Sequence, residues 1–257
     1  MSTLFDSDPQ FREKETLRRF FSLLPLWGSL AGGHVFRWFA VNIPMSLAGD
    51  PAFTSDLDVV ACLRGVPPMQ DQLIHRTWEV KVGLLGRDGS ARSTKAGKTR
   101  RTLNQLNAYR RFGSPSVSLL DMLLCEDEAL EGWPGSAEDA ILTKGEACRA
   151  NGFGYDIAAF EANDLSDPRI NFRARTWSQN PMHTVVTLVR PINFPMTEPF
   201  SSLVARIEAF CEAGGHRGPP RIGQQVHYCR ECRQLQLVHA RLHGVCPDCG
   251  SKLAVQT

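Results

Sequence analysis

Apolar positions along the chain alternate between helical and extended spacing, a pattern that predicts an α/β protein. Apolar residues between 17 and 24 recur at i, i+3, i+4 and i+7, which predicts an amphipathic first helix that ends at Pro25. Further helices are expected at residues 99–112, where Gly113 stops the helix, and at 138–150 and 198–213. Strands are expected at residues 34–41, 57–63, 77–85, 116–125, 154–161 and 183–190. This order predicts a mixed central sheet flanked by helices.

The composition is that of an ordinary globular protein. Of 257 residues, 42% are hydrophobic and 22% are charged, and the formal net charge is only +2. The N-terminal segment lacks the apolar core of a secretion signal, and glycine, proline and charged residues interrupt the most apolar stretch, residues 20–47. We therefore expect a soluble, cytoplasmic protein that has no membrane partner.

The chain is expected to divide near residue 214, because the segment GGHRGPPRIGQ combines glycine, proline and charge without apolar periodicity. Residues 1–213 would form one large domain, since they contain no internal repeat. Residues 214–225 would be a linker, and residues 226–257 a compact C-terminal module.

That module contains a strong metal-binding motif. Cys229, Cys232, Cys246 and Cys249 form two C-x2-C pairs that are separated by thirteen residues. Two such pairs supply the four thiolates of a closed, structural Zn²⁺ site. The alternatives are two disulfides, a catalytic zinc or a redox pair; the expected cytosolic location disfavours the first, and four sulfur ligands disfavour the second. The module resembles a zinc ribbon, a family that binds nucleic acid or partner proteins.

A second group of residues suggests a catalytic metal site in the large domain. Glu79 and Lys81 are two residues apart on a predicted strand and so share a face, and Asp58 opens the preceding apolar strand. If the strands pair, the two carboxylates can bind Mg²⁺ or Mn²⁺, and Lys81 can orient an attacking water or stabilise a charged phosphorus centre. The reaction implied is phosphodiester hydrolysis. Asp56 shares the strand face of Asp58, but a cap or turn role is favoured for it.

With these residues in this order, the chain resembles the PD-(D/E)xK nuclease superfamily, in which a metal-binding aspartate precedes an E-x-K strand. The resemblance covers residues 10–125 and implies a restriction-endonuclease-like core. It assigns Asp58, Glu79 and Val80 to the metal ion and Lys81 to catalysis. RecB-like members often carry an upstream histidine ligand as well, and His34 is the candidate here, although a histidine that simply begins a strand is an equal alternative.

The helix after the E-x-K strand extends the resemblance. Gln105 and Tyr109 form a Q-x-x-x-Y motif similar to that of RecB-like nucleases, and residues at i and i+4 share a helical face. The resemblance implies that both residues position substrate. Without it, they would be a polar flank beside the apolar stripe of the helix.

Charge is concentrated near this motif. Residues 81–111 contain nine Lys and Arg residues and one acid, Asp88, although the whole chain is nearly neutral. We expect this segment to clamp a nucleic-acid backbone, and the alternative is a solvated basic loop. The expected phosphate contacts are Arg87, Arg92, Lys95, Lys98, Arg100 and Arg101.

The sequence therefore predicts a metal-dependent nuclease with a C-terminal zinc ribbon, and DNA is favoured over RNA as its substrate. The rival hypothesis is a catalytically inactive nucleic-acid-binding or adaptor protein that keeps the nuclease fold and recruits through the ribbon. A third is a subunit that cuts only within a defence, repair or transposition assembly. A protein partner would bind through the ribbon or through residues 126–213.

Overall fold

The structure, a computed structural model, describes residues 16, 34–65, 68, 72–85, 96–125, 138–161, 185–213, 224–239, 246 and 248–251. Its strands are β1 (Val35–Pro44), β2 (Asp56–Arg64), β3 (Leu73–Leu85), β4 (Val117–Cys125), β5 (Gly154–Glu161), β6 (Val185–Val189), β7 (Gln224–Cys229) and β8 (Gln234–His239). The helices are the short 3-10 helix η2 (Met45–Ala48) and the α-helices α3 (Ala96–Arg111), α4 (Glu138–Ala150) and α5 (Phe200–Ala213). The protein is therefore α/β, as the sequence predicted.

The predicted elements after residue 33 are all present, with ends shifted by a few residues. The predicted first helix, residues 17–24, lies outside the described residues, and so does most of the predicted linker. Among the described helices, none is both long enough and apolar enough to cross a membrane.

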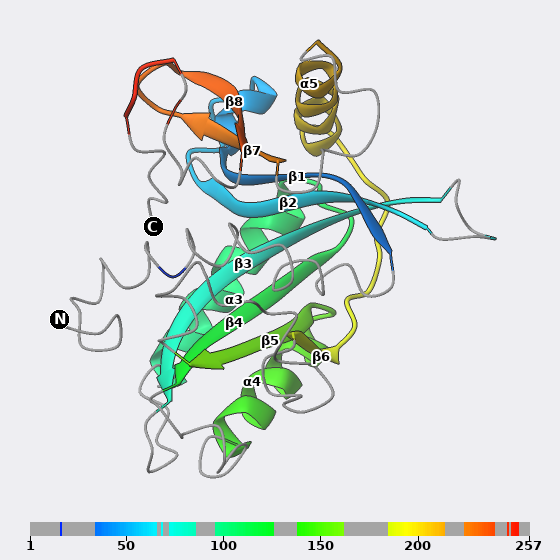
Figure 1. The fold of residues 1–257 in the computed structure, drawn as a ribbon. Coiled ribbons are helices and arrows are strands. Elements are labelled where there is room, and N and C mark those ends of the chain that lie inside the picture. The colour runs from blue at the N-terminus through cyan, green and yellow to red at the C-terminus, as the bar shows by residue number, and fades with distance from the viewer. Residues whose placement is uncertain are drawn as a thin grey trace, which may run out of the picture.

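All the described strands belong to one mixed sheet, whose order is β6-β5-β4-β3-β2-β1-β7-β8 (Figure 1). Strands β1, β2 and β3 form an antiparallel meander. Helix α3 then connects β3 to the parallel strand β4, and α4 connects β4 to the parallel strand β5. A helical crossover is the usual way to join parallel neighbours, because the chain must return to the starting edge of the sheet.

Helices α3 and α4 lie on the same face of the sheet. Lys81 of β3 and Asp121 of β4 are register partners, so their side chains leave the same face as that of Glu79. Tyr109 of α3 contacts Glu79, and Lys144 of α4 contacts Asp121. Consecutive right-handed crossovers in one direction give this arrangement. We call this the helical face of the sheet.

The apolar core lies between this face and the helices. Leu106 of α3, Phe112 just after it, Leu119 of β4, Tyr155 of β5 and Phe200 of α5 are all completely buried in one cluster. Burial of a large apolar side chain contributes about 1.5–3 kcal/mol, so this cluster fixes the helices against the strands.

A tight turn ends α3 at the residue that the sequence marked. Gly113 has a φ of 99°, a left-handed conformation that glycine adopts without strain. A Cβ atom at this position would lie 2.5 Å from Oγ1 of Thr197, so the close approach also requires glycine. The N–H of Ser114 bonds to the carbonyl of Tyr109 at 3.2 Å, which fixes the last turn of the helix.

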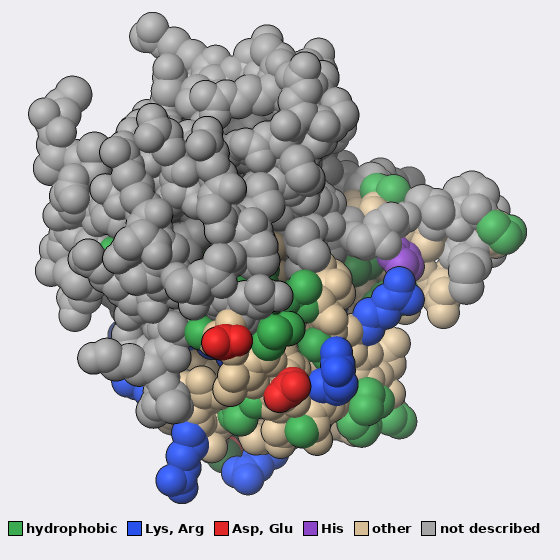
Figure 2. Space-filling model, turned by 90° about the horizontal axis from the view of Figure 1, so that it is seen from below, with side chains coloured by type: hydrophobic (Ala, Val, Ile, Leu, Met, Phe, Trp, Pro, Cys, Tyr) green, Lys and Arg blue, Asp and Glu red, His purple; other side chains and the backbone are tan. Residues whose placement is uncertain are grey.

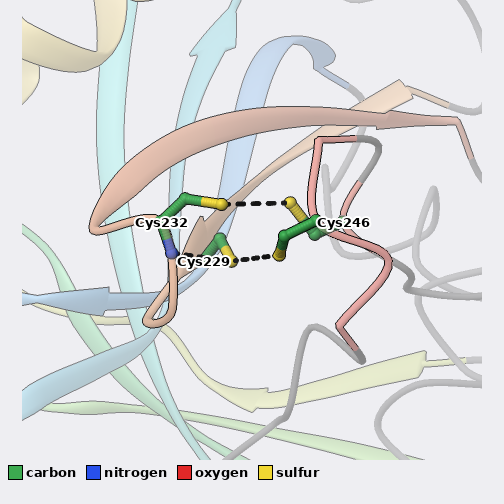
Figure 3. Close-up of side chains that lie close together, drawn as sticks. Cys229, Cys232 and Cys246 are labelled. Atoms are coloured by element: carbon green, nitrogen blue, oxygen red, sulfur yellow. Dashed lines mark hydrogen bonds between the residues drawn. The ribbon is translucent and has the colours of Figure 1, made fainter.

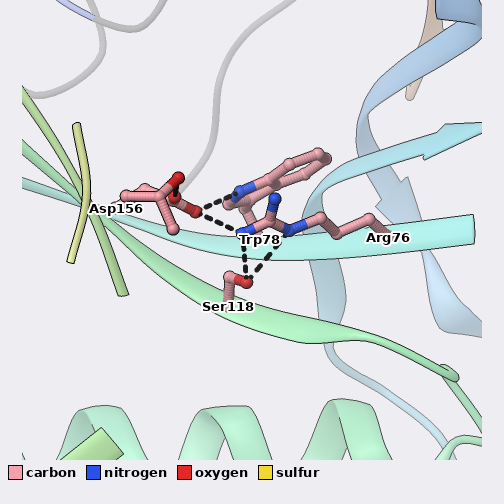
Figure 4. A network of polar contacts seen from close by, with 5 residues as sticks. Arg76, Trp78, Ser118 and Asp156 are labelled. Carbon is pink, nitrogen blue, oxygen red and sulfur yellow. Dashed lines mark hydrogen bonds and ion pairs between the residues drawn. The ribbon is translucent and has the colours of Figure 1, made fainter. Parts of the chain in front are cut away.

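The opposite face of the sheet carries a buried polar network (Figure 4). Oδ2 of Asp156 accepts hydrogen bonds from Nη2 of Arg76 at 2.7 Å and from Nε1 of Trp78 at 2.9 Å. The Arg76 guanidinium also bonds to Ser118 and stacks 4.8 Å from the Trp78 ring centroid. Burial lowers the pKa of Arg76, and the Asp156 carboxylate opposes that shift. The network ties β3, β4 and β5 together.

Strands β7 and β8, which lie in and just before the predicted C-terminal module, extend the main sheet. Strand β7 pairs with β1 in parallel, with Ala40 opposite Val226 and Val41 opposite His227. Strand β8 then pairs with β7 as an antiparallel hairpin. Backbone hydrogen bonds therefore link the strand that carries the first cysteine of the motif, through β1, to the strands that carry the carboxylates.

The described surface carries both signs of charge. On the face seen from below, acidic side chains lie among Lys and Arg side chains and apolar patches (Figure 2). Large exposed apolar side chains occur between β6 and α5, where Ile192 is 56% exposed.

A buried ion pair joins α4 to β4. Nζ of Lys144 contacts Oδ2 of Asp121, which also accepts a 2.8 Å hydrogen bond from the hydroxyl of Tyr155. All three side chains are buried. Burying charges is costly, and removal of one partner leaves the other uncompensated.

Substitution Lys144→Met should therefore destabilise the fold by about 3–5 kcal/mol, because Asp121 stays buried without its cation. The double variant Asp121→Asn/Lys144→Met should recover most of that loss. Chemical denaturation measures both, with the exposed Leu142→Ala on the same helix as a control that changes stability by less than about 1 kcal/mol. Equal stability of Lys144→Met and the wild type would contradict the conclusion that Lys144 compensates the buried charge of Asp121.

Candidate functional site

The register of β2 and β3 brings the predicted carboxylates together. Val59 pairs with Trp78, so Asp58 comes level with Glu79 on the helical face. Oδ2 of Asp58 accepts a 2.7 Å hydrogen bond from the N–H of Val80, which fixes this carboxylate against β3. Asp58 is half-buried and Glu79 is only 1% exposed.

Both oxygens of Glu79 have defined partners. Oε1 lies 2.5 Å from Nζ of Lys81, and Oε2 accepts a hydrogen bond from the hydroxyl of Tyr109. The same hydroxyl accepts the N–H of Asp58 at 3.2 Å. Tyr109 therefore connects both carboxylate-bearing strands to α3.

The environment keeps Tyr109 in its neutral form. Complete burial raises the pKa of its hydroxyl well above the ordinary value, and the negative charges of Asp58 and Glu79 raise it further. Because the hydroxyl retains its proton at physiological pH, it acts as a permanent donor to Glu79.

Gln105 lies one helical turn before Tyr109, about 6 Å closer to the start of α3. Helix α3 connects two parallel strands, so it runs in the opposite direction to β3. Gln105 is therefore displaced from Tyr109 in the direction that leads along β3 from Glu79 to Lys81. Its Oε1 is buried and has no hydrogen-bond partner among the described residues. A buried acceptor without a partner is costly, and it marks a position where a bound group can be accommodated.

The structure does not bring His34 to these residues. Val35 pairs with Arg64 at one end of the β1–β2 ladder, whereas Pro44 pairs with Asp56 at the other. At about 3.3 Å per residue, His34 lies roughly 20 Å from Asp58 along the strand. This geometry favours the alternative in which His34 simply precedes a strand.

Only part of the predicted basic clamp falls within the described residues. Arg100 and Arg101 are exposed on the first turns of α3. Arg87, Arg92, Lys95 and the side chain of Lys98 lie outside the described part of the chain. Arg110 has a structural role, since its guanidinium stacks 4.1 Å from the Phe153 ring centroid and bonds to the carbonyl of Asn151.

The four predicted zinc ligands form one cluster (Figure 3). The ligand atoms of Cys229, Cys232, Cys246 and Cys249 all lie within 4.8 Å of one another. The Sγ atoms of Cys229 and Cys249 are 3.7 Å apart, and those of Cys232 and Cys246 are 3.8 Å apart.

These distances match a tetrahedral zinc site. Four sulfurs at about 2.3 Å from an ion are about 3.8 Å from one another. A disulfide needs about 2.05 Å, and all four cysteines are free thiols. The Ser251 hydroxyl lies 2.8 Å from Sγ of Cys249, and its hydrogen bonds lower the pKa of that thiol. The cluster can therefore hold a metal ion such as zinc.

An ion pair that the sequence did not predict joins this cluster to the carboxylate site. Nη2 of Arg230, within the first cysteine pair, contacts Oδ2 of Asp56, two residues before Asp58. Burial raises the pKa of Asp56, and the charge of Arg230 opposes that shift. The partners are 174 residues apart in sequence, and no local pattern links them.

No protein-family model matches the chain, and neither does any curated protein or solved structure with which it was compared. The assignment of function therefore rests on the geometry of the site.

Substitution Tyr109→Phe should destabilise the protein by about 1–3 kcal/mol, because Oε2 of Glu79 loses a buried donor. The amide of Asp58 should also exchange faster with solvent, since it loses its acceptor. Hydrogen exchange and urea unfolding measure the two effects. Unchanged exchange at Asp58 would show that the hydroxyl does not hold β2.

Substitution Cys232→Ser should reduce bound zinc by one equivalent per chain, because a closed four-thiolate site loses one ligand. Mass spectrometry of the metal content measures this. Cys148→Ser, which removes another free buried cysteine from α4, should leave the zinc content unchanged. Equal zinc content in the wild type and Cys232→Ser would refute the predicted site.

Proposed function

We propose that this protein is a metal-dependent nuclease that has a restriction-endonuclease-like core and hydrolyses phosphodiester bonds, with DNA as the favoured substrate. The observation that carries the proposal is the meeting of Asp58, Glu79 and Lys81 at the junction of β2 and β3. An antiparallel meander followed by a helical crossover to a parallel strand is consistent with that core.

The residues present fit a hard divalent cation. Asp58 and Glu79 supply carboxylate oxygens, which are the ligand type that Mg²⁺ and Mn²⁺ prefer. The backbone carbonyl oxygen of Val80 would be the ligand from that residue, whose N–H already holds Asp58. The buried Oε1 of Gln105 is a further oxygen on the Lys81 side of Tyr109. When bound, the cation would neutralise phosphate charge and acidify a water molecule.

The remaining chemistry comes from the chain itself. The side chain of Lys81 is 33% exposed, so its ammonium group can reach both Glu79 and an incoming phosphate. It would hold the attacking water or the negative charge on the phosphate oxygens. Tyr109 would keep the Glu79 carboxylate in place, and Gln105 would position the substrate. Arg100 and Arg101 at the start of α3 would contact the nucleic-acid backbone.

The rival proposal is a binding or adaptor protein that has the same fold and no activity. It retains the basic residues and the zinc cluster but requires no catalytic lysine. The presence of both acids beside Lys81, which contacts Glu79, supports the enzyme, since an inactive site has no need of all three. Activity confined to a larger assembly is consistent with the same geometry.

Purified full-length protein should cleave nucleic acid in the presence of Mg²⁺ or Mn²⁺ and not in the presence of a chelator. The substrates are single-stranded, duplex and branched DNA, and RNA. Substitution Lys81→Ala should lower the rate by about 10²–10⁴-fold while DNA binding is retained, because the lysine acts on the reaction rather than on affinity. Mg²⁺ added after the chelator should restore cleavage.

Asp58→Asn should abolish cleavage, whereas the matched control Asp50→Asn should leave it unchanged, because Asp50 lies before β2 and, among the contacts described, its carboxylate bonds only to the nearby N–H of Ala52. Wild-type rates in Lys81→Ala would rule out the assignment of the site. Absence of cleavage from every substrate would favour the adaptor proposal instead.

A further inference from the structure

A second group of metal-ligating side chains lies on the same sheet. Cys62 of β2 and His75 of β3 are direct register partners, and Glu208 of α5 meets them from the helix. The ligand atoms of all three lie within 4.8 Å of one another. Within the described part of the chain, this trio and the four-cysteine cluster are the two groups of three or more such side chains.

The trio is separate from the carboxylate site. Cys62 lies four residues after Asp58 and His75 four residues before Glu79, so both are on the helical face. Four residues of strand correspond to about 13 Å, which is too far for an ion to be shared. The inference below is therefore independent of the proposed nuclease activity.

His75 supplies an observation that points to a ligand. Its Nε2 is buried and has no hydrogen-bond partner among the described residues. The imidazole lies beside Trp38, with ring centroids 6.1 Å apart, so the ring is held within packed surroundings. A buried ring nitrogen without a partner is costly, whereas a metal ion would satisfy it.

A basic side chain now neutralises part of the trio. Nη1 of Arg37 lies 3.3 Å from Oε1 of Glu208, and Nε1 of Trp38 donates to the same oxygen at 3.5 Å. The Arg37 side chain is 36% exposed, so it can move into solvent without disturbing the core. Its guanidinium thus occupies the place of a cation and competes with one.

A nucleophilic role for Cys62 does not fit these surroundings. The side chain is completely buried, and burial followed by the charge of Glu208 raises the pKa of the thiol to about 11. A reactive cysteine has a lowered pKa and access to solvent. The same thiol can bind a metal ion, because coordination displaces its proton.

We propose that Cys62, His75 and Glu208 form a second transition-metal site, with Zn²⁺ as the favoured ion. Sulfur, imidazole nitrogen and carboxylate oxygen are a ligand set for Zn²⁺, whereas Mg²⁺ requires oxygen alone. Three protein ligands leave one tetrahedral position for water. The bound ion would fasten α5 to the β2–β3 hairpin.

The test is the zinc content of the full-length protein after equilibration with Zn²⁺ and removal of free metal. The wild type should hold two equivalents per chain. Cys62→Ser and His75→Gln should each hold one, which the four-cysteine cluster retains. Cys232→Ser should also hold one. The control Cys148→Ser, which removes a free cysteine as buried as Cys62, should hold two.

A further variant separates metal competition from folding. Arg37→Gln removes the competing cation and should bind the second Zn²⁺ at least several-fold more tightly, whereas Glu208→Gln should bind it more weakly. Glu208 is part-exposed on α5, so its substitution tests the site even where Cys62→Ser does not fold. Co²⁺ bound to Cys232→Ser should show absorption bands of a single-thiolate site, and the double variant Cys232→Ser/His75→Gln should lose them.

One zinc equivalent in the wild type, unchanged in Cys62→Ser and Glu208→Gln, would overturn the proposal. Equal affinity of Arg37→Gln and the wild type for the second ion would overturn it as well, since it would show that the guanidinium and the ion do not compete.

Discussion

The candidate chemistry depends on the antiparallel register of β2 and β3. With Val59 opposite Trp78, Asp58 comes level with Glu79, and the N–H of Val80 binds the Asp58 carboxylate. A shift of one residue would turn the Asp58 side chain to the other face of the sheet and separate the two acids. The buried polar network of Trp78 on that other face opposes such a shift, since it would lose its partners.

The same register has consequences further along the sheet. It places Cys62 beside His75, so that one hairpin carries two candidate groups of metal ligands, covered by α3 at one end and approached by α5 at the other. Strand β7 adds to the other side of β1, and Arg230 reaches Asp56 at the start of β2. The four-cysteine cluster is thereby connected to the carboxylate site through both backbone pairing and an ion pair.

The sequence predicted much of this arrangement because its signals are local. Strand alternation and the stop at Gly113 depend on neighbouring residues, and so does the spacing of the cysteines, whose cluster the structure contains. Contacts between distant segments carry no such signal: the Arg230–Asp56 pair and the approach of Glu208 to Cys62 arise from the order of strands and the path of α5. His34 illustrates the same limit, since its separation from Asp58 follows from strand register rather than from sequence distance.

The most direct test of the proposed metal site at Asp58 and Glu79 is the binding of Mn²⁺ to zinc-loaded protein, followed by electron paramagnetic resonance without any substrate. The wild type should bind Mn²⁺ at a site that the double variant Asp58→Asn/Glu79→Gln lacks, because both carboxylate charges are removed while the shapes of the side chains are kept. Equal Mn²⁺ binding by the double variant and the wild type would contradict the assignment of these two carboxylates to a divalent cation.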